Sequence, residues 1–135
     1  MQVNDLIDIA KNAKKNAYAN ITKYKVGAAL LAESGTVYIG VNVEEPSILG
    51  LSNCAERVAI QNAIAHGERK FKAIAVVGSN YDDKCDSTLV PCGTCLQYIL
   101  DMCDNVDIIC YMDGKVSSRK VKDLLNSPFE LEKQN

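Results

Sequence analysis

The sequence predicts one α/β domain in three layers, with helices on both faces of a mixed five-stranded sheet. Helix-like and strand-like segments alternate along the chain in the order α-β-β-α-β-α-β-β-α, which is typical of a sheet covered by helices. The chain has 135 residues, of which 47% are hydrophobic and 24% charged, as in ordinary globular proteins. It contains no linker, repeat or low-complexity stretch, so we expect residues 1–135 to form a single domain.

Apolar spacing and turn residues define the elements of the first half. In order, we expect a helix over residues 3–19, strands over 26–31 and 36–42, an irregular loop over 43–53, and a helix from Cys54 to about His66. The two strands are joined by the short turn Glu33-Ser34-Gly35 and therefore form a hairpin. His66-Gly67 is a suitable helix end, because glycine accepts the left-handed backbone found there.

The second half continues the alternation. In order, we expect a strand over residues 71–78, a polar loop over 79–90, a helix from Cys92 to about Met102, strands over 107–111 and 116–120, a short helix over 121–125 and a polar tail. The run FKAIAVVG at 71–78 is apolar at every position but one, which indicates a strand covered on both faces.

Charge and hydropathy exclude several classes of protein. Fifteen Lys and Arg residues against seventeen Asp and Glu give a net charge of −2, which argues against a nucleic-acid-binding protein. No apolar run approaches the ~20 residues that span a bilayer, and the first twenty residues lack the apolar core of a secretory signal. We therefore expect a cytoplasmic protein that contacts neither nucleic acid nor membrane.

Three of the six cysteines lie in a pattern that predicts a catalytic zinc site. Cys54 and Glu56 form a Cys-x-Glu at the start of one helix, and Pro91 precedes a Cys-x-x-Cys formed by Cys92 and Cys95 at the start of another. Catalytic zinc uses three protein ligands and leaves the fourth position to water. Helix N-termini favour thiolates, and a carboxylate beside the metal can move a proton from that water. Cys85, Cys103 and Cys110 have no such spacing.

The chain resembles the short, single-domain cytidine deaminases from about Ala17 to Phe129, and the resemblance covers four motifs. They are the A-Y-x-P-Y-S-x-F-x-V-G-A-A-L pattern at residues 17–30, the N-x-E of Asn42 and Glu44, the C-A-E-R-x-A-I at 54–60 and the P-C-G-x-C-x-Q at 91–97. The resemblance implies a cytidine-deaminase-like α/β fold and hydrolytic deamination of cytidine or deoxycytidine by a zinc enzyme.

The resemblance also implies roles for individual residues. Cys54, Cys92 and Cys95 would bind Zn²⁺, and Glu56 would carry the proton. Asn42 and Glu44 would bind ribose hydroxyls, whereas Tyr24 and the backbone of Ala55 would contact the base. The further residues implied are Arg57, whose cation would offset the negative charge of three thiolates on zinc, Gln97 behind the ligands, and Phe129, an aromatic that would reach the site of a neighbouring subunit in a homotetramer.

The sequence departs from the family pattern mainly at the loop over residues 45–53. Glu45 and Pro46 replace the family's Asn-Ala, Ile48 and Leu49 replace an aromatic residue, and the loop carries one extra residue. This change keeps a second substrate open, a cytosine nucleoside analogue such as blasticidin S. A different class also stays open, a zinc-stabilised nucleoside-binding domain without turnover, although Glu56 argues against it.

Overall fold

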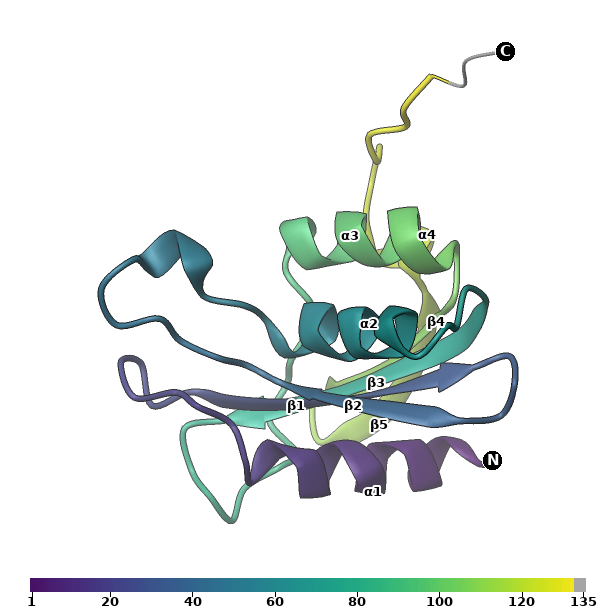
Figure 1. Ribbon diagram of the computed structural model, residues 1–135. Helices are drawn as coiled ribbons and strands as arrows, with labels where there is room; N and C mark the ends of the chain where they lie inside the picture. Colours follow the sequence, from purple (N-terminus) through teal and green to yellow (C-terminus); the bar gives the residue numbers. More distant parts are fainter. Residues whose placement is uncertain (133–135) are drawn as a thin grey trace.

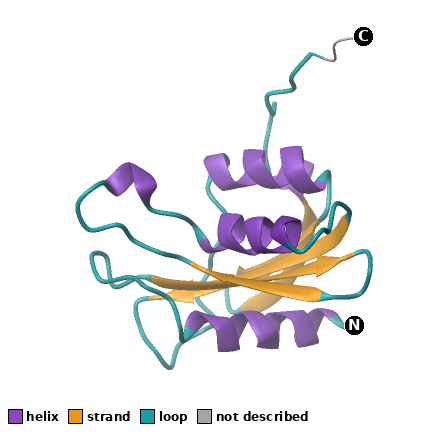
Figure 2. Ribbon diagram, in the orientation of Figure 1, coloured by secondary structure: helices purple, strands orange, loops and turns teal. Residues whose placement is uncertain are grey.

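A computed structural model describes residues 1–132 and confirms the predicted three-layer α/β fold. The elements are α1 (Val3–Lys14), β1 (Lys25–Ala32), β2 (Val37–Val41), the 3-10 helix η1 (Leu49–Leu51), α2 (Ala55–Ala65), β3 (Phe71–Ser79), α3 (Gly93–Cys103), β4 (Asp107–Met112), β5 (Lys115–Lys120) and α4 (Val121–Leu124). Helix α1 covers one face of the sheet, and α2 and α3 cover the other (Figures 1 and 2). No helix within residues 1–132 has both the length and the apolar character needed to cross a bilayer.

The strands lie in the order β2-β1-β3-β4-β5. Strands β2 and β3 each run antiparallel to β1, and β4 runs parallel to β3. Strands β2 and β3 therefore point in the same direction, and their carboxyl ends lie at the same edge of the sheet. Helix α2 follows β2 and helix α3 follows β3, so both helices begin at this edge, on the left in Figure 1.

The core is divided by the sheet into two apolar layers. Along β1, Ala28 and Leu30 face α2 and α3, whereas Ala29 faces α1. Along β3, Ile74 and Ala75 divide between the layers in the same way, because successive side chains of a strand point to opposite faces. This double burial explains why the run over residues 71–78 is apolar at almost every position.

The first helix ends at Lys14, five residues before the predicted end at Ala19. The apolar periodicity of the sequence continues through Ala17, but Tyr18 forms a β-bridge with Val43. Residues 19–23 then form a loop held by the Glu44 carboxylate, which accepts hydrogen bonds from the Ile21 and Thr22 backbone N–H groups and from the Thr22 hydroxyl. A contact with a residue more than twenty positions away overrides the local helical pattern.

Two glycines of the sheet allow the backbone of a helix to lie in direct contact with a strand. A Cβ atom on Gly40 of β2 would lie 2.3 Å from the Ala55 carbonyl oxygen and 2.4 Å from the Ala59 nitrogen of α2. A Cβ atom on Gly27 of β1 would lie 2.2 Å from the Ala10 carbonyl oxygen of α1. Glycine at these positions thus fixes how closely both helix layers pack.

The Gly40→Ala variant tests this close packing. We expect its free energy of unfolding to fall by about 1–3 kcal/mol, because the added methyl group must push α2 away from the sheet. Urea denaturation measures the change. Gly50→Ala is the matched control, since nothing lies within 4 Å of the position of its added Cβ atom. Equal stability of the wild type and Gly40→Ala would contradict the described packing.

Candidate active site

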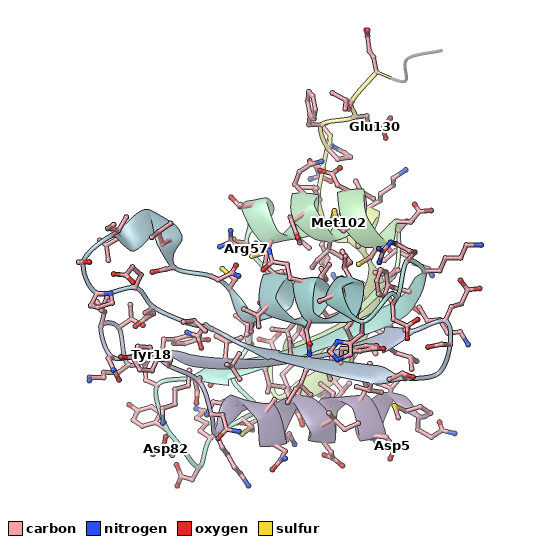
Figure 3. All side chains as sticks on the ribbon, viewed as in Figure 1. Asp5, Tyr18, Arg57, Asp82, Met102 and Glu130 are labelled. Carbon is pink, nitrogen blue, oxygen red and sulfur yellow. The ribbon has the colours of Figure 1, made fainter. Side chains whose placement is uncertain are left out.

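A pocket of about 560 Å³ lies at the sheet edge where α2 and α3 begin. This volume is within the range of about 300–1,000 Å³ that is usual for small-molecule sites. Its lining contains Asn42, Glu44, Cys54, Ala55, Glu56, Arg57, Cys92 and Cys95, all of which the sequence analysis singled out. Figure 3 places Arg57 at the start of α2, facing the start of α3.

The Glu56 carboxylate is buried in the first turn of α2, and the residue is only 5% exposed. Removal from water, with a smaller contribution from the nearby charge of Cys54, raises the pKa of Glu56 to about 6. A carboxylate with a pKa near neutrality can both accept and return a proton, which suits it to general acid–base catalysis.

Two of the three predicted ligands are already in contact. A hydrogen bond from the Cys95 thiol lowers the pKa of Cys54 to about 5, and the same bond raises the pKa of Cys95. The Arg57 Nη2 lies 3.5 Å from the Cys54 sulfur and also favours its thiolate. Cys54 and Cys95 thus share one proton at the N-termini of two helices.

Cys92 lines the same pocket but is exposed, directly before the first residue of α3. Accordingly, no three His, Cys, Asp or Glu side chains within residues 1–132 already form a complete metal site. The donor chemistry nevertheless fits zinc, since three thiols from two chain segments line one pocket beside a compensating guanidinium. The buried Nε of Arg57, which has no hydrogen-bond partner among the described residues, is a further donor at this position.

Asn42 and Glu44 lie at the pocket, but their polar atoms also hold backbone. The Asn42 side chain donates to the Tyr24 carbonyl at 2.8 Å and accepts from the Val26 N–H at 2.9 Å, joining the end of β2 to the start of β1. The Thr22 hydroxyl, and then the Thr22 and Ile21 N–H groups, lower the pKa of Glu44, so this carboxylate is ionised near neutral pH. Their binding of ribose stays a prediction.

Tyr24, Gln97 and Phe129 lie outside this pocket. The Tyr24 ring packs beside Gly78, where an added Cβ atom would lie 3.1 Å from ring atom Cε1. The Gln97 side chain accepts from the Phe129 N–H at 3.0 Å and donates to the Phe129 carbonyl at 2.8 Å, which ties the tail to α3. The Phe129 residue itself is 67% exposed.

The pocket lining also contains Val26, Leu89 and Val90, which the sequence did not single out as pocket residues. Pro91 of the Pro-Cys-x-x-Cys motif lines it too, as do Leu49, Gly50, Ser52 and Asn53 of the loop over residues 45–53, whose change was expected to affect the substrate. Leu89 and Val90 belong to the segment expected as a polar loop, and two apolar residues directly before Pro91-Cys92 are the signal that could have identified them. Leu49 and Gly50 belong to the altered loop, so the departure from the family pattern falls on the pocket wall itself.

The site combines a buried carboxylate with two thiols that share a proton, at the N-termini of two helices. This combination is typical of a metal-dependent hydrolase. Comparison with protein families matches residues 1–112 to the family described as cytidine and deoxycytidylate deaminase zinc-binding region. The chain therefore belongs to the zinc-binding cytidine and deoxycytidylate deaminase family.

Individual relatives agree with this assignment. A cytidine deaminase of Sporosarcina psychrophila is 40% identical over 135 residues, covering 98% of this chain and 94% of the relative. A blasticidin-S deaminase of Bacillus cereus is 28% identical over 125 residues, covering 90% and 87%. The crystal structure of cytidine deaminase from Burkholderia pseudomallei superposes with a TM-score of 0.84 at 40% identity, covering 96% of this chain and 100% of that one.

Proposed function

We propose that this protein is a zinc-dependent hydrolase that converts cytidine and deoxycytidine to uridine and deoxyuridine with release of ammonia. The observation that carries the proposal is the Glu56 carboxylate, buried at the pocket beside Cys54 and Cys95. A domain that only bound nucleosides would have no need of a buried carboxylate whose pKa lies close to neutrality. The higher identity to cytidine deaminases than to the blasticidin-S deaminase supports an ordinary nucleoside as substrate.

Cys54, Cys92 and Cys95 would hold the zinc ion, with the Arg57 guanidinium offsetting the charge of the three thiolates. When bound, zinc supplies a Lewis acid that lowers the pKa of water. Binding of the metal would release the proton that Cys54 and Cys95 share.

The chain's own residues carry out the proton transfers. Glu56 accepts a proton from water as the water oxygen bonds to C4 of the base, and it passes that proton to ring nitrogen N3. Glu56 then takes the second water proton and delivers it to the amino group. The C4–N bond breaks, ammonia leaves, and the C4 carbonyl of uridine remains, so that both water protons are accounted for.

The pocket walls suit a nucleoside. Apolar residues Val26, Leu89 and Val90 can cover a pyrimidine ring, while Asn42 and Glu44 present polar atoms where a sugar would extend. We propose that the Ala55 backbone and Tyr24 contribute to base binding as well, since Ala55 lines the pocket and the Tyr24 carbonyl accepts a hydrogen bond from the pocket residue Asn42.

We also propose a homotetramer in which the tail of one chain reaches the site of a neighbour. The tail follows α4 and extends away from the body of the molecule (Figure 1). Figure 3 labels Glu130 on this tail, and its carboxylate lies 4.0 Å from the Lys122 Nζ of α4. The Gln97 hydrogen bonds fix where this extension starts. Phe129 presents an exposed ring that a pocket on a second copy would cover.

Zinc content tests the ligand set. We expect one zinc ion per chain in the wild type and loss of most zinc in Cys92→Ala, because two thiols leave the metal weakly held. Elemental analysis of dialysed protein measures it. Cys85→Ala is the matched control, since Cys85 lies in a different pocket, and it should retain full zinc. Loss of zinc from Cys85→Ala alone would overturn the assignment.

Glu56→Gln tests the proposed reaction. We expect it to keep the fold and the zinc but to lose about 10²–10⁴-fold or more in kcat, because an amide cannot carry a proton. The assay follows ultraviolet absorbance with cytidine, deoxycytidine and blasticidin S as substrates. Near-normal turnover by Glu56→Gln would contradict the mechanism. Turnover of blasticidin S alone would replace the proposed substrate with the nucleoside analogue.

Removal of residues 127–135 tests the assembly. We expect the Michaelis constant to rise more than thermal stability falls, because the exposed tail contributes little to the core of its own chain. Phe129→Ala should reproduce most of the rise, whereas Leu131→Ala, another exposed apolar tail residue, should not. An active monomer by light scattering, or an unchanged Michaelis constant after truncation, would contradict the proposal.

A further inference from the structure

The segment between β3 and α3 spans the sheet from one helix layer to the other. Its second half delivers Leu89, Val90, Pro91 and Cys92 to the pocket. Its first half lies beside the carboxyl end of α1, on the opposite side of the sheet, where Figure 3 labels Asp82. How this first half is held therefore bears on where the second half lies.

Lys14, the last residue of α1, is buried to 2% exposure although its side chain carries a charge. Its Nζ donates to the Tyr81 carbonyl at 2.6 Å and to the Lys84 carbonyl at 3.1 Å. The nearby Asp82 carboxylate is exposed and bonded to Lys25 at 2.9 Å. The hydrogen-bond partners of the buried ammonium are thus two backbone carbonyls of the segment.

Ser79, the last residue of β3, is directed at the same two carbonyls. Its hydroxyl lies 2.8 Å from the Tyr81 carbonyl oxygen and also within hydrogen-bonding distance of the Lys84 carbonyl oxygen. It accepts from the Tyr81 N–H at 3.2 Å. We refer to Lys14, Ser79 and these two carbonyls as the lysine clamp.

The geometry of the sheet places both side chains of the clamp. Ser79 pairs with Lys25 at the end of the β1–β3 ladder. Gly27, two residues further along β1, lacks the Cβ atom that would lie 2.5 Å from the Lys14 nitrogen. The end of α1 can therefore lie directly on the sheet beside the end of β3.

Four polar residues are buried in the described part of the chain, namely Lys14, Asn42, Glu56 and Ser79. Asn42 and Glu56 line the pocket, whereas the other two form the clamp. Burying an ammonium group is unfavourable unless it is well bonded. Here those bonds go to the segment that leads to Cys92, which an apolar residue at position 14 could not hold.

We propose that Lys14 is a positioning residue for deamination, which fixes the segment over residues 79–92 so that Leu89, Val90 and Cys92 keep their places at the pocket. The inference rests on the proposed function for its effect on catalysis. The clamp itself is a structural feature that can be measured without any activity.

The test compares Lys14→Met, which keeps the length of the side chain but donates no hydrogen bond, with the wild type. We expect amide hydrogen exchange over residues 80–91 of the full chain to become about tenfold faster or more, because local opening is no longer opposed by the clamp. We expect kcat/KM to fall about tenfold or more, since displacement of pocket residues impairs alignment of the reacting groups.

Three further variants separate positioning from general stability. Lys14→Arg keeps a cation with N–H donors and should recover at least about half of the lost exchange protection and kcat/KM. Lys15→Met removes the adjacent exposed lysine and should behave as the wild type. Leu6→Ala weakens the core under the same helix and should retain the wild-type kcat/KM at temperatures where it is folded.

Ser79→Ala loosens the same segment from the β3 side and serves in place of Lys14→Met if that variant does not fold. Unchanged exchange over residues 80–91 in the clamp variants would overturn the proposal, whatever the protein's activity. An equal fall of kcat/KM in Leu6→Ala, or no recovery in Lys14→Arg, would also overturn it. Faster exchange in a protein whose wild type lacks deaminase activity would refute the proposed function and leave the clamp standing.

Discussion

The shared direction of β2 and β3 is the constraint on which the rest of this structure depends. Because both strands run antiparallel to β1, the helices that follow them begin at one edge of the sheet. Cys54 and Cys92 each stand immediately before the first residue of such a helix, and Glu56 and Cys95 lie in the first turns. Residues almost forty positions apart in the chain therefore meet at one pocket, each near the positive end of a helix dipole.

This arrangement also explains the electrostatics of the pocket. Burial raises the pKa of Glu56 and so favours its protonated form. The Cys95 thiol and the Arg57 guanidinium lower the pKa of Cys54 and so favour its thiolate. The two shifts run in opposite directions within one small volume. A carboxylate that can accept a proton and a thiolate that can bind a metal thus coexist, as hydrolysis assisted by a metal requires.

The spacing of apolar residues predicted most of the helices and strands. The features that it did not predict depend on contacts between residues far apart in the sequence. The strand over residues 71–78 and the helix beginning at Cys54 were predictable because their apolar spacing reports burial directly. The end of α1 was not, since Glu44 holds the following loop from a distant position. The strand order could not be derived from the elements alone, because several orders bury the same faces.

In the candidate site, too, local spacing predicted some residues, whereas other contacts depend on tertiary packing. The Cys-x-Glu and Cys-x-x-Cys spacings are local, and the four residues they contain lie at one pocket. The pairing of Gln97 with the Phe129 backbone depends on tertiary packing between α3 and the tail, which spacing does not encode. Lys14 gave no signal either, because a lysine at the end of an amphipathic helix is ordinarily exposed.

We propose that two helix N-termini bring three thiols to one metal ion and leave one position for water. X-ray absorption at the zinc edge of the purified protein tests it most directly. We expect three sulfur ligands at about 2.3 Å and one lighter ligand at about 2.0 Å. Four sulfur ligands would indicate a closed structural site, and a coordination shell without sulfur would exclude the cysteines. Either result would contradict a catalytic zinc site formed by Cys54, Cys92 and Cys95.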